Sequence, residues 1–136
     1  MSIIKWSNSL MIGNKQIDDE HQVFVSIINE LHTYIVEQRG NEQTKQIVTK
    51  LYDYSKYHFA HEEELMESIG YPRLETHKTE HAVFSLELDV LSRTEDYKNI
   101  YALECLFNFA TNWLFEHIKH SDKDIARFLH EKDRTI

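Results

Sequence analysis

Histidine and carboxylate residues recur in this sequence at spacings that suit a metal site. His58 and Glu62 are four residues apart, and so are His77 and His81. Residues four apart lie on adjacent turns of one helix face, so each pair can present two ligand atoms to one ion. Imidazole and carboxylate groups are ligands that iron, manganese and zinc all accept. The two pairs therefore predict a metal site built between helices.

Three further residues extend the candidate ligand set. His117 lies in a strongly apolar stretch, and His21 lies near the start of another. Asp122 follows His117 by five residues, which in an unbroken α-helix would turn its side chain about 140° away. We therefore expect the helix to unwind between His120 and Asp122, with Ser121 opening a short helix of its own.

Each of these residues, taken alone, has an ordinary structural explanation. A single helical histidine is usually a surface or core residue, and Glu62 belongs to a run of acids that would normally face solvent. Five histidines and two carboxylates at compatible spacings favour one metal site over seven separate explanations. Four histidines remain outside the set, and we interpret them as partly exposed polar residues: His32, His61, His120 and His130.

Long amphipathic helices must carry these residues. Apolar residues recur at intervals of three and four, and only three Gly and one Pro interrupt the chain. We predict an all-α protein, an antiparallel up-down-up-down four-helix bundle with an irregular N-terminal arm over residues 1–17. Gly40 is expected to end the first helix, Asn41 to cap the second and Pro72 to open the third. The predicted helices span residues 18–38, 41–69, 72–94 and 99–120, with a short helix over 122–130.

Positions equally far from a hairpin turn lie at the same height, so counting tests whether the candidates can meet. His21 is 19 residues before Gly40 and His58 is 18 after it. Both therefore lie roughly 28 Å from that turn along their helices. In the second hairpin, residue 98 lies halfway between His117 and the midpoint of His77 and His81. Apolar residues are sparse around residue 98, as expected for a turn. The ligands of both hairpins can therefore converge in one layer of the bundle.

Composition and length limit the classes of function. Asp and Glu number 23 against 15 Lys and Arg, a formal charge of −8, so we expect no nucleic-acid partner. The 136 residues suit a single domain over residues 1–136. No long apolar stretch opens the chain, so we expect no membrane span or secretory signal, and a cytoplasmic location. Cys105 lies in an apolar stretch and is expected to be buried.

The sequence resembles the bacterial hemerythrin family over nearly its whole length. The motifs that carry the resemblance are Trp6, Gly13, Ile17-Asp18 and His21, then His58-Phe59-Ala60-His61-Glu62-Glu63, Met66 and Tyr71-Pro72, then His77-Lys78-Thr79-Glu80-His81, and finally Trp113-Leu114-Phe115-Glu116-His117 to Asp122. The resemblance implies a non-heme di-iron centre, two iron ions with an oxo or hydroxo bridge. It implies these ligands: His77, His81 and His117 on one iron, His21 and His58 on the other, and Glu62 and Asp122 bridging both.

The resemblance also implies reversible binding of O2 at the iron that has only two histidines and keeps an open position. Carboxylate-rich di-iron enzymes of ferritin-like bundles use Glu and Glu-x-x-His arrangements instead. We therefore expect an oxygen-binding protein and not an enzyme. Apolar residues near the ligands are candidates for the wall of the oxygen pocket, and they fit ordinary core packing equally well: Val25, Phe59, Trp113, Leu114 and Ile118.

Three functions are compatible with these residues. The first is storage, delivery or scavenging of O2 by a monomer, with an oxygen-consuming enzyme as a candidate partner. The second is an oxygen or redox sensor that signals through a partner. The third is a di-iron enzyme that reduces peroxide or NO, for which we find no dedicated acid or base beyond the ligands.

Overall fold

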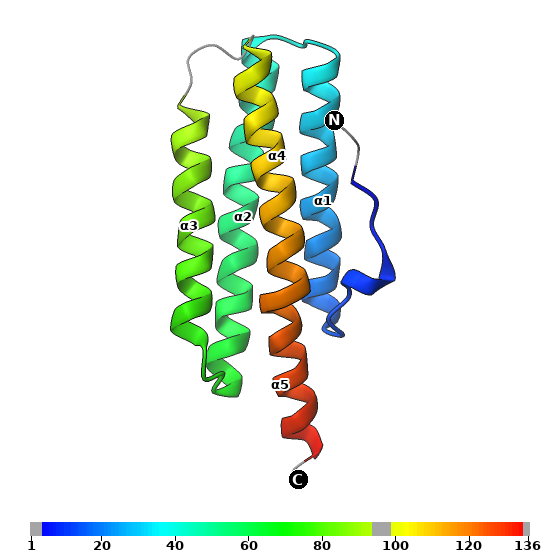
Figure 1. Cartoon of the computed structure of the whole chain (residues 1–136), viewed down its shortest axis with the longest axis vertical. Helices are drawn as coiled ribbons and strands as arrows, with labels where there is room; N and C mark the ends of the chain where they lie inside the picture. Colours follow the sequence, from blue (N-terminus) through cyan, green and yellow to red (C-terminus); the bar gives the residue numbers. More distant parts are fainter. Residues whose placement is uncertain (1–3, 94–98, 135–136) are drawn as a thin grey trace.

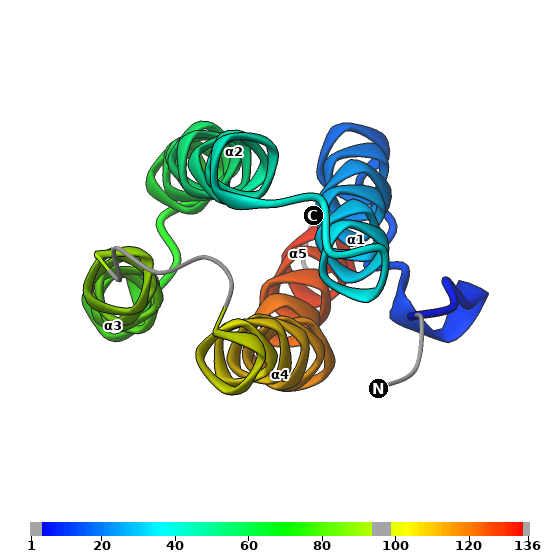
Figure 2. The same cartoon turned by 90° about the horizontal axis from the view of Figure 1, so that it is seen from above.

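The computed structural model describes residues 4–93 and 99–134, and this part of the chain is an all-α bundle with an N-terminal arm, as predicted. Figure 1 shows its long helices side by side, and Figure 2 shows them from above at the corners of the bundle in chain order. After α4 the chain continues into α5, which extends beyond the bundle. The helices are α1 (Lys15–Val36), α2 (Asn41–Ile69), α3 (Leu74–Ser92), α4 (Ile100–Glu116), a π-helical segment (His117–Asp122) and α5 (Lys123–Arg134), preceded by a 3-10 turn (Asn8–Leu10).

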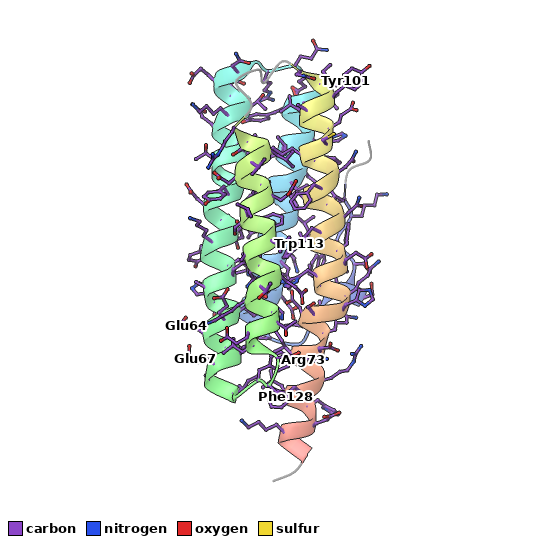
Figure 3. All side chains as sticks on the ribbon, turned by 60° about the vertical axis from the view of Figure 1, so that its left-hand side comes forward. Glu64, Glu67, Arg73, Tyr101, Trp113 and Phe128 are labelled. Carbon is purple, nitrogen blue, oxygen red and sulfur yellow. The ribbon has the colours of Figure 1, made fainter. Side chains whose placement is uncertain are left out.

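Apolar side chains from all four long helices fill the core. Its largest fully buried members include Phe24, Leu31, Leu51, Phe84, Leu88 and Phe107. A second, smaller cluster joins α5 to the α2–α3 turn through Met66, Tyr71 and Ile125. Figure 3 labels Arg73 of this turn near Phe128 of α5, at the same end of the molecule. This second cluster packs α5 against the end of α2 and the start of α3.

The N-terminal arm is tied to α1 by a buried carboxylate. Asp18 accepts hydrogen bonds from the backbone N–H groups of Ile12, at 2.7 Å, and Gly13, at 3.0 Å. Gly13 has a φ of 93°, a left-handed conformation that glycine adopts most easily. The side chain of Asn14 caps α1, which therefore begins at Lys15, earlier than the expected residue 18.

The turn between α1 and α2 differs from the sequence expectation. Gly40 was expected to end the first helix, but α1 ends at Val36, and Gln38 takes the left-handed conformation that follows it, with a φ of 51°. Gly40 stands instead at the N-cap of α2, the position expected for Asn41, where it offers no side chain to cap the helix. Sequence pattern misassigned both positions because a non-glycine residue adopted the conformation that glycine favours.

The boundaries of the second hairpin also shift. Pro72 was expected to open the third helix, but it lies in the turn, and α3 begins at Leu74. The predicted end of that helix at residue 94 and the hairpin midpoint at residue 98 lie outside the described residues. α4 begins at Ile100, where the side chain of Asn99 accepts a hydrogen bond from the backbone N–H of Ala102.

α4 is strongly apolar, yet its Cys105 is exposed, contrary to expectation. The buried residues Leu103, Leu106 and Phe107 form the side of the helix that faces the core, and position 105 lies on a different side. Among the described helices, α4 included, none is both long enough and apolar enough to cross a membrane.

Candidate metal centre

The predicted ligands lie together at the end of the bundle where α1 and α3 begin. They form two sets, which we call the three-histidine group (His77, His81 and His117) and the two-histidine group (His21 and His58). Ligand atoms of the three-histidine group and of Glu62 all lie within 4.8 Å of one another, and so do those of the two-histidine group and Glu62. All seven predicted ligands are buried, with at most 4% of each residue exposed: His21, His58, Glu62, His77, His81, His117 and Asp122.

Two carboxylates join the two histidine groups. Oε1 of Glu62 lies 3.0 Å from Nε2 of His77, and its Oε2 lies 2.6 Å from Nε2 of His58. Asp122 is arranged in the same way, with Oδ1 3.1 Å from Nε2 of His77 and Oδ2 3.0 Å from Nε2 of His21. Both oxygens of Asp122 are buried without a hydrogen-bond partner among the described residues. Each carboxylate thus turns one oxygen towards each group, which suits a bridge between two cations.

A π-helical segment brings Asp122 into this cluster. The sequence predicted that the helix would unwind before Asp122, but it stays helical through His117–Asp122. The backbone N–H of Lys123 bonds to the carbonyl oxygen of Ile118, five residues back. Such bonds bring residues five apart onto one face, so His117 and Asp122 point the same way without a break. Ser121 therefore opens no new helix, and its hydroxyl donates a hydrogen bond to Glu80 instead.

Opposite charges compensate one another inside the cluster. Burial opposes the protonation of His21, but the contacts with the carboxylates of Asp122 and Glu62 outweigh it and raise the pKa of His21 to about 9. Burial likewise opposes protonation of His117, whose pKa Asp122 nevertheless raises well above the ordinary value. Burial and the charge of Glu62 oppose the ionisation of Asp122, yet His117 and His21 hold its pKa below the ordinary range. A cation bound here would take the place of these protons.

Comparison with known proteins identifies the family. The family model described as the hemerythrin HHE cation binding domain matches residues 13–129. The chain belongs to the hemerythrin family. A bacteriohemerythrin of Stenotrophomonas maltophilia is 32% identical to this hemerythrin over 133 residues, which cover 93% of this chain and 81% of that protein. A bacteriohemerythrin of Clostridium acetobutylicum is 28% identical over 123 residues, covering 88% and 95% of the two chains. A hemerythrin-like protein of Naegleria gruberi is 26% identical over 121 residues, 89% of each chain.

The family resemblance seen in the sequence is thereby confirmed, and a hemerythrin domain implies a di-iron site. The donor set of this hemerythrin fits such a group. Imidazole nitrogens and buried carboxylate oxygens are ligands that iron accepts, and both oxygens of Asp122 lack a hydrogen-bond partner within the described ranges. The two groups that share Glu62 could therefore hold a metal each.

Three carboxylates that the sequence reasoning missed support ligand histidines of this hemerythrin from behind. Each accepts a hydrogen bond from an Nδ1–H, which leaves Nε2 free to face a metal. Burial opposes the ionisation of Glu80, but its hydrogen bond with His117 is the larger effect and lowers its pKa to about 2. The described pairs are Glu20 with His58 at 2.8 Å, Glu63 with His81 at 2.8 Å and Glu80 with His117 at 3.2 Å.

Adjacency in the sequence was the available signal for these carboxylates. Glu20 and Glu80 directly precede ligand histidines, and Glu63 directly follows Glu62. Each of them nevertheless serves a histidine on a different helix, so adjacency alone does not indicate the partner. Only the packing of neighbouring helices pairs them.

Aromatic rings cover the cluster of this hemerythrin. The ring of Phe59 stacks on His81, with centroids 4.0 Å apart, and Trp113 stacks on His117 at 4.4 Å. Figure 3 labels Trp113 in the bundle. Phe24, which was not among the residues predicted to line the oxygen pocket, packs edge-on against His58, with ring centroids 5.9 Å apart. The other predicted pocket residues belong to the buried core cluster: Val25, Leu114 and Ile118.

The four remaining histidines of this hemerythrin lie outside the two ligand groups. His120 and His130 are exposed, and half-buried His32 packs with its ring 5.3 Å from the ring of Phe107. His61 has 23% of its side chain exposed, and its Nδ1 lies 2.5 Å from the carboxylate of Glu20. It therefore contacts a residue that supports a ligand without being among the ligands itself.

Proposed function

We propose that this protein binds O2 reversibly at a non-heme di-iron centre. In this proposal, one iron is held by the three-histidine group and the other by the two-histidine group. Glu62 and Asp122 would bridge the two ions, together with a solvent-derived oxo or hydroxo group. The observation that carries the proposal is the placement of one oxygen of each buried carboxylate beside each histidine group.

The unequal number of histidines supports O2 as the ligand. The iron held by His21 and His58 has one protein nitrogen fewer, which leaves a position for a small molecule. Two ferrous ions supply the electrons that O2 accepts. Simple ligand counting leaves the ferrous centre with about one positive charge, because the five imidazoles are neutral. Such a centre favours binding over the oxygen activation that carboxylate-rich sites perform.

The surroundings of the cluster support reversibility. Phe24, Phe59 and Leu114 are buried, and aromatic rings lie against both histidine groups. An apolar wall restricts the access of water and protons to the metals, which slows irreversible oxidation. The protein therefore stores, delivers or scavenges O2 in this proposal.

The test combines an iron count with visible spectroscopy. We expect two irons per chain after anaerobic loading with Fe2+. Admission of air then produces an oxygen-dependent absorption band that disappears again when O2 is removed. Irreversible oxidation in air, a count of one iron, or catalytic consumption of peroxide or NO would contradict the proposal and favour a sensor or an enzyme.

A further inference from the structure

Carboxylates of the described residues form a repeating pattern around the bundle. Each lies on one helix and accepts a hydrogen bond from Nδ1 of a ligand histidine on the next helix along the chain. Consecutive helices are neighbours, so the pattern passes around the bundle (Figure 2). Its members are Glu20 of α1 with His58 of α2, Glu63 of α2 with His81 of α3, and Glu80 of α3 with His117 beyond α4.

Two ligand histidines have no such carboxylate behind Nδ1 among the described residues, namely His77 of α3 and His21 of α1. His21 is the one whose Nδ1 is also buried. Its side chain is 0% exposed, and its Nδ1 is buried without a hydrogen-bond partner in the described part of the chain. Of the five ligand histidines, it alone has a buried and unpartnered Nδ1 there. A carboxylate behind an imidazole fixes the orientation of the ring and makes it a stronger metal ligand. His21 lacks both of these aids.

His58, the other member of the two-histidine group, shares its supporting carboxylate, Glu20, with His61. Glu20 places Oε1 2.8 Å from Nδ1 of His58 and Oε2 2.5 Å from Nδ1 of His61. Its charge therefore serves two imidazoles, one of them partly exposed to solvent. In the three-histidine group, by contrast, His81 and His117 each have a supporting carboxylate of their own.

We propose that Glu20, Glu63 and Glu80 are positioning residues that make the two metal positions unequal in strength. The ion held by His21 and His58 is the weaker one, so it binds last and leaves first. The chain then passes through a form with a single iron in the three-histidine group during loading and loss. This inference rests on the proposed di-iron site, and it assigns the more labile iron to the position proposed to bind O2.

The experiment follows iron release to a ferrous chelator, ferrozine, from the anaerobically loaded wild-type protein. We expect two phases of one iron per chain each, with rates about tenfold or more apart. Glu20→Gln should speed the fast phase about 10- to 100-fold and leave the slow phase unchanged. Glu80→Gln should speed the slow phase by a similar factor. Glu80→Asp, which keeps the carboxylate, should release the slow iron at a rate between those of the wild type and Glu80→Gln.

A matched control and a spectroscopic signature separate positioning from general stability. Glu30 also lies on α1 but pairs with Lys50 at the surface, at 3.1 Å, so Glu30→Gln should change neither phase. In the Zn2+-loaded protein, nuclear magnetic resonance should detect hydrogen-bonded Nδ1 protons for three ligand histidines. Glu80→Gln should shift that of His117 while leaving that of His58 in place.

The possible results distinguish this inference from the proposed function. Two irons that leave in one phase, or a slow phase that responds to Glu20→Gln, would overturn the inference while leaving the di-iron site intact. A wild-type protein that takes up no iron at all would overturn the proposed function and, with it, the inference. Equal shifts of all three Nδ1 resonances in Glu80→Gln would show a general structural effect and would also contradict it.

Discussion

Histidine rings at this site depend on carboxylates for their protonation state. Contacts with Asp122 and Glu62 raise the pKa of His21 to about 9 against the effect of burial. The pKa of His77 is raised for the same reason. At neutral pH the metal-free cluster therefore holds protons that a metal must displace, and metal binding should release them.

The stability of the metal-free protein should consequently fall as the pH rises from 6.5 to 9. The folded-state pKa of His21 lies above its ordinary value of 6.5, so the protonated ring stabilises the fold fully below pH 6.5. This contribution is lost as the pH rises through about 9. Thermal unfolding monitored by circular dichroism at several pH values measures the effect. The metal-loaded protein should lack this pH dependence, because metal replaces the protons.

His21→Asn should reduce the dependence without abolishing it, because other buried histidines also have a raised pKa. His120→Asn, which changes an exposed ring, should leave it as in the wild type. A metal-free melting temperature that is constant or rises between pH 6.5 and 9 would show that the buried imidazoles are not protonated.

At the scale of elements, the segment His117–Asp122 decides whether the ligand set is complete. Its π-helical hydrogen bonds place His117 and Asp122 on one face although they are five residues apart. A π-helical turn holds one residue more than the α-helical turn it replaces. Removing one residue would leave the two ligands four apart, which is the spacing that shares a face in an α-helix.

Deleting the exposed Lys119 should therefore convert the segment to α-helix and keep the site. We expect this variant to bind two irons per chain, with a free energy of unfolding within about 1 kcal/mol of the wild type. Deleting the exposed Asn112 of regular α4 is the matched control. That deletion should rotate the segment with His117 and Asp122 by about 100° against the rest of the helix and take both residues out of the cluster. We expect this variant to bind fewer than two irons per chain. Iron counts after gel filtration make the comparison. Loss of iron from the Lys119 deletion equal to that from the Asn112 deletion would refute this role of the π-helix.

At the scale of the whole molecule, the ligands cross-link the bundle. Residues of α1, α2, α3 and the segment after α4 meet in one cluster at the end where α1 and α3 begin. The apolar core fills the bundle with side chains of the same helices, and α5 packs on the α2–α3 turn through Ile125. In the proposed site, metal binding would therefore stabilise the same helix arrangement as the apolar core.

Removal of metal should lower the melting temperature without abolishing the fold. Metal at a thousand times its dissociation constant contributes about 4 kcal/mol, which corresponds to roughly 10 °C or more for a chain of this size. Chelation followed by calorimetry measures the change, and helicity at 20 °C, by circular dichroism, should stay near that of the loaded protein because the apolar core persists. Addition of metal should restore the melting temperature. The His77→Asn, His81→Asn double variant serves as the control and should respond little to chelation. A wild-type melting temperature that chelation leaves unchanged would contradict a cross-linking role.

The sequence by itself determined the fold class, the family and which residues gather at the site. Helical periodicity and four-residue spacings such as His77 and His81 depend only on the local geometry of a helix, so they can be read along the chain. The tertiary structure decided the rest. The hydrogen-bond register of the segment His117–Asp122 was one such feature, since a spacing of five residues fits either a break in the helix or a π-helical turn. The contacts of Glu20 with His58 and His61 depend on how α1 meets α2. Such contacts join residues far apart in the chain, and no local pattern records them.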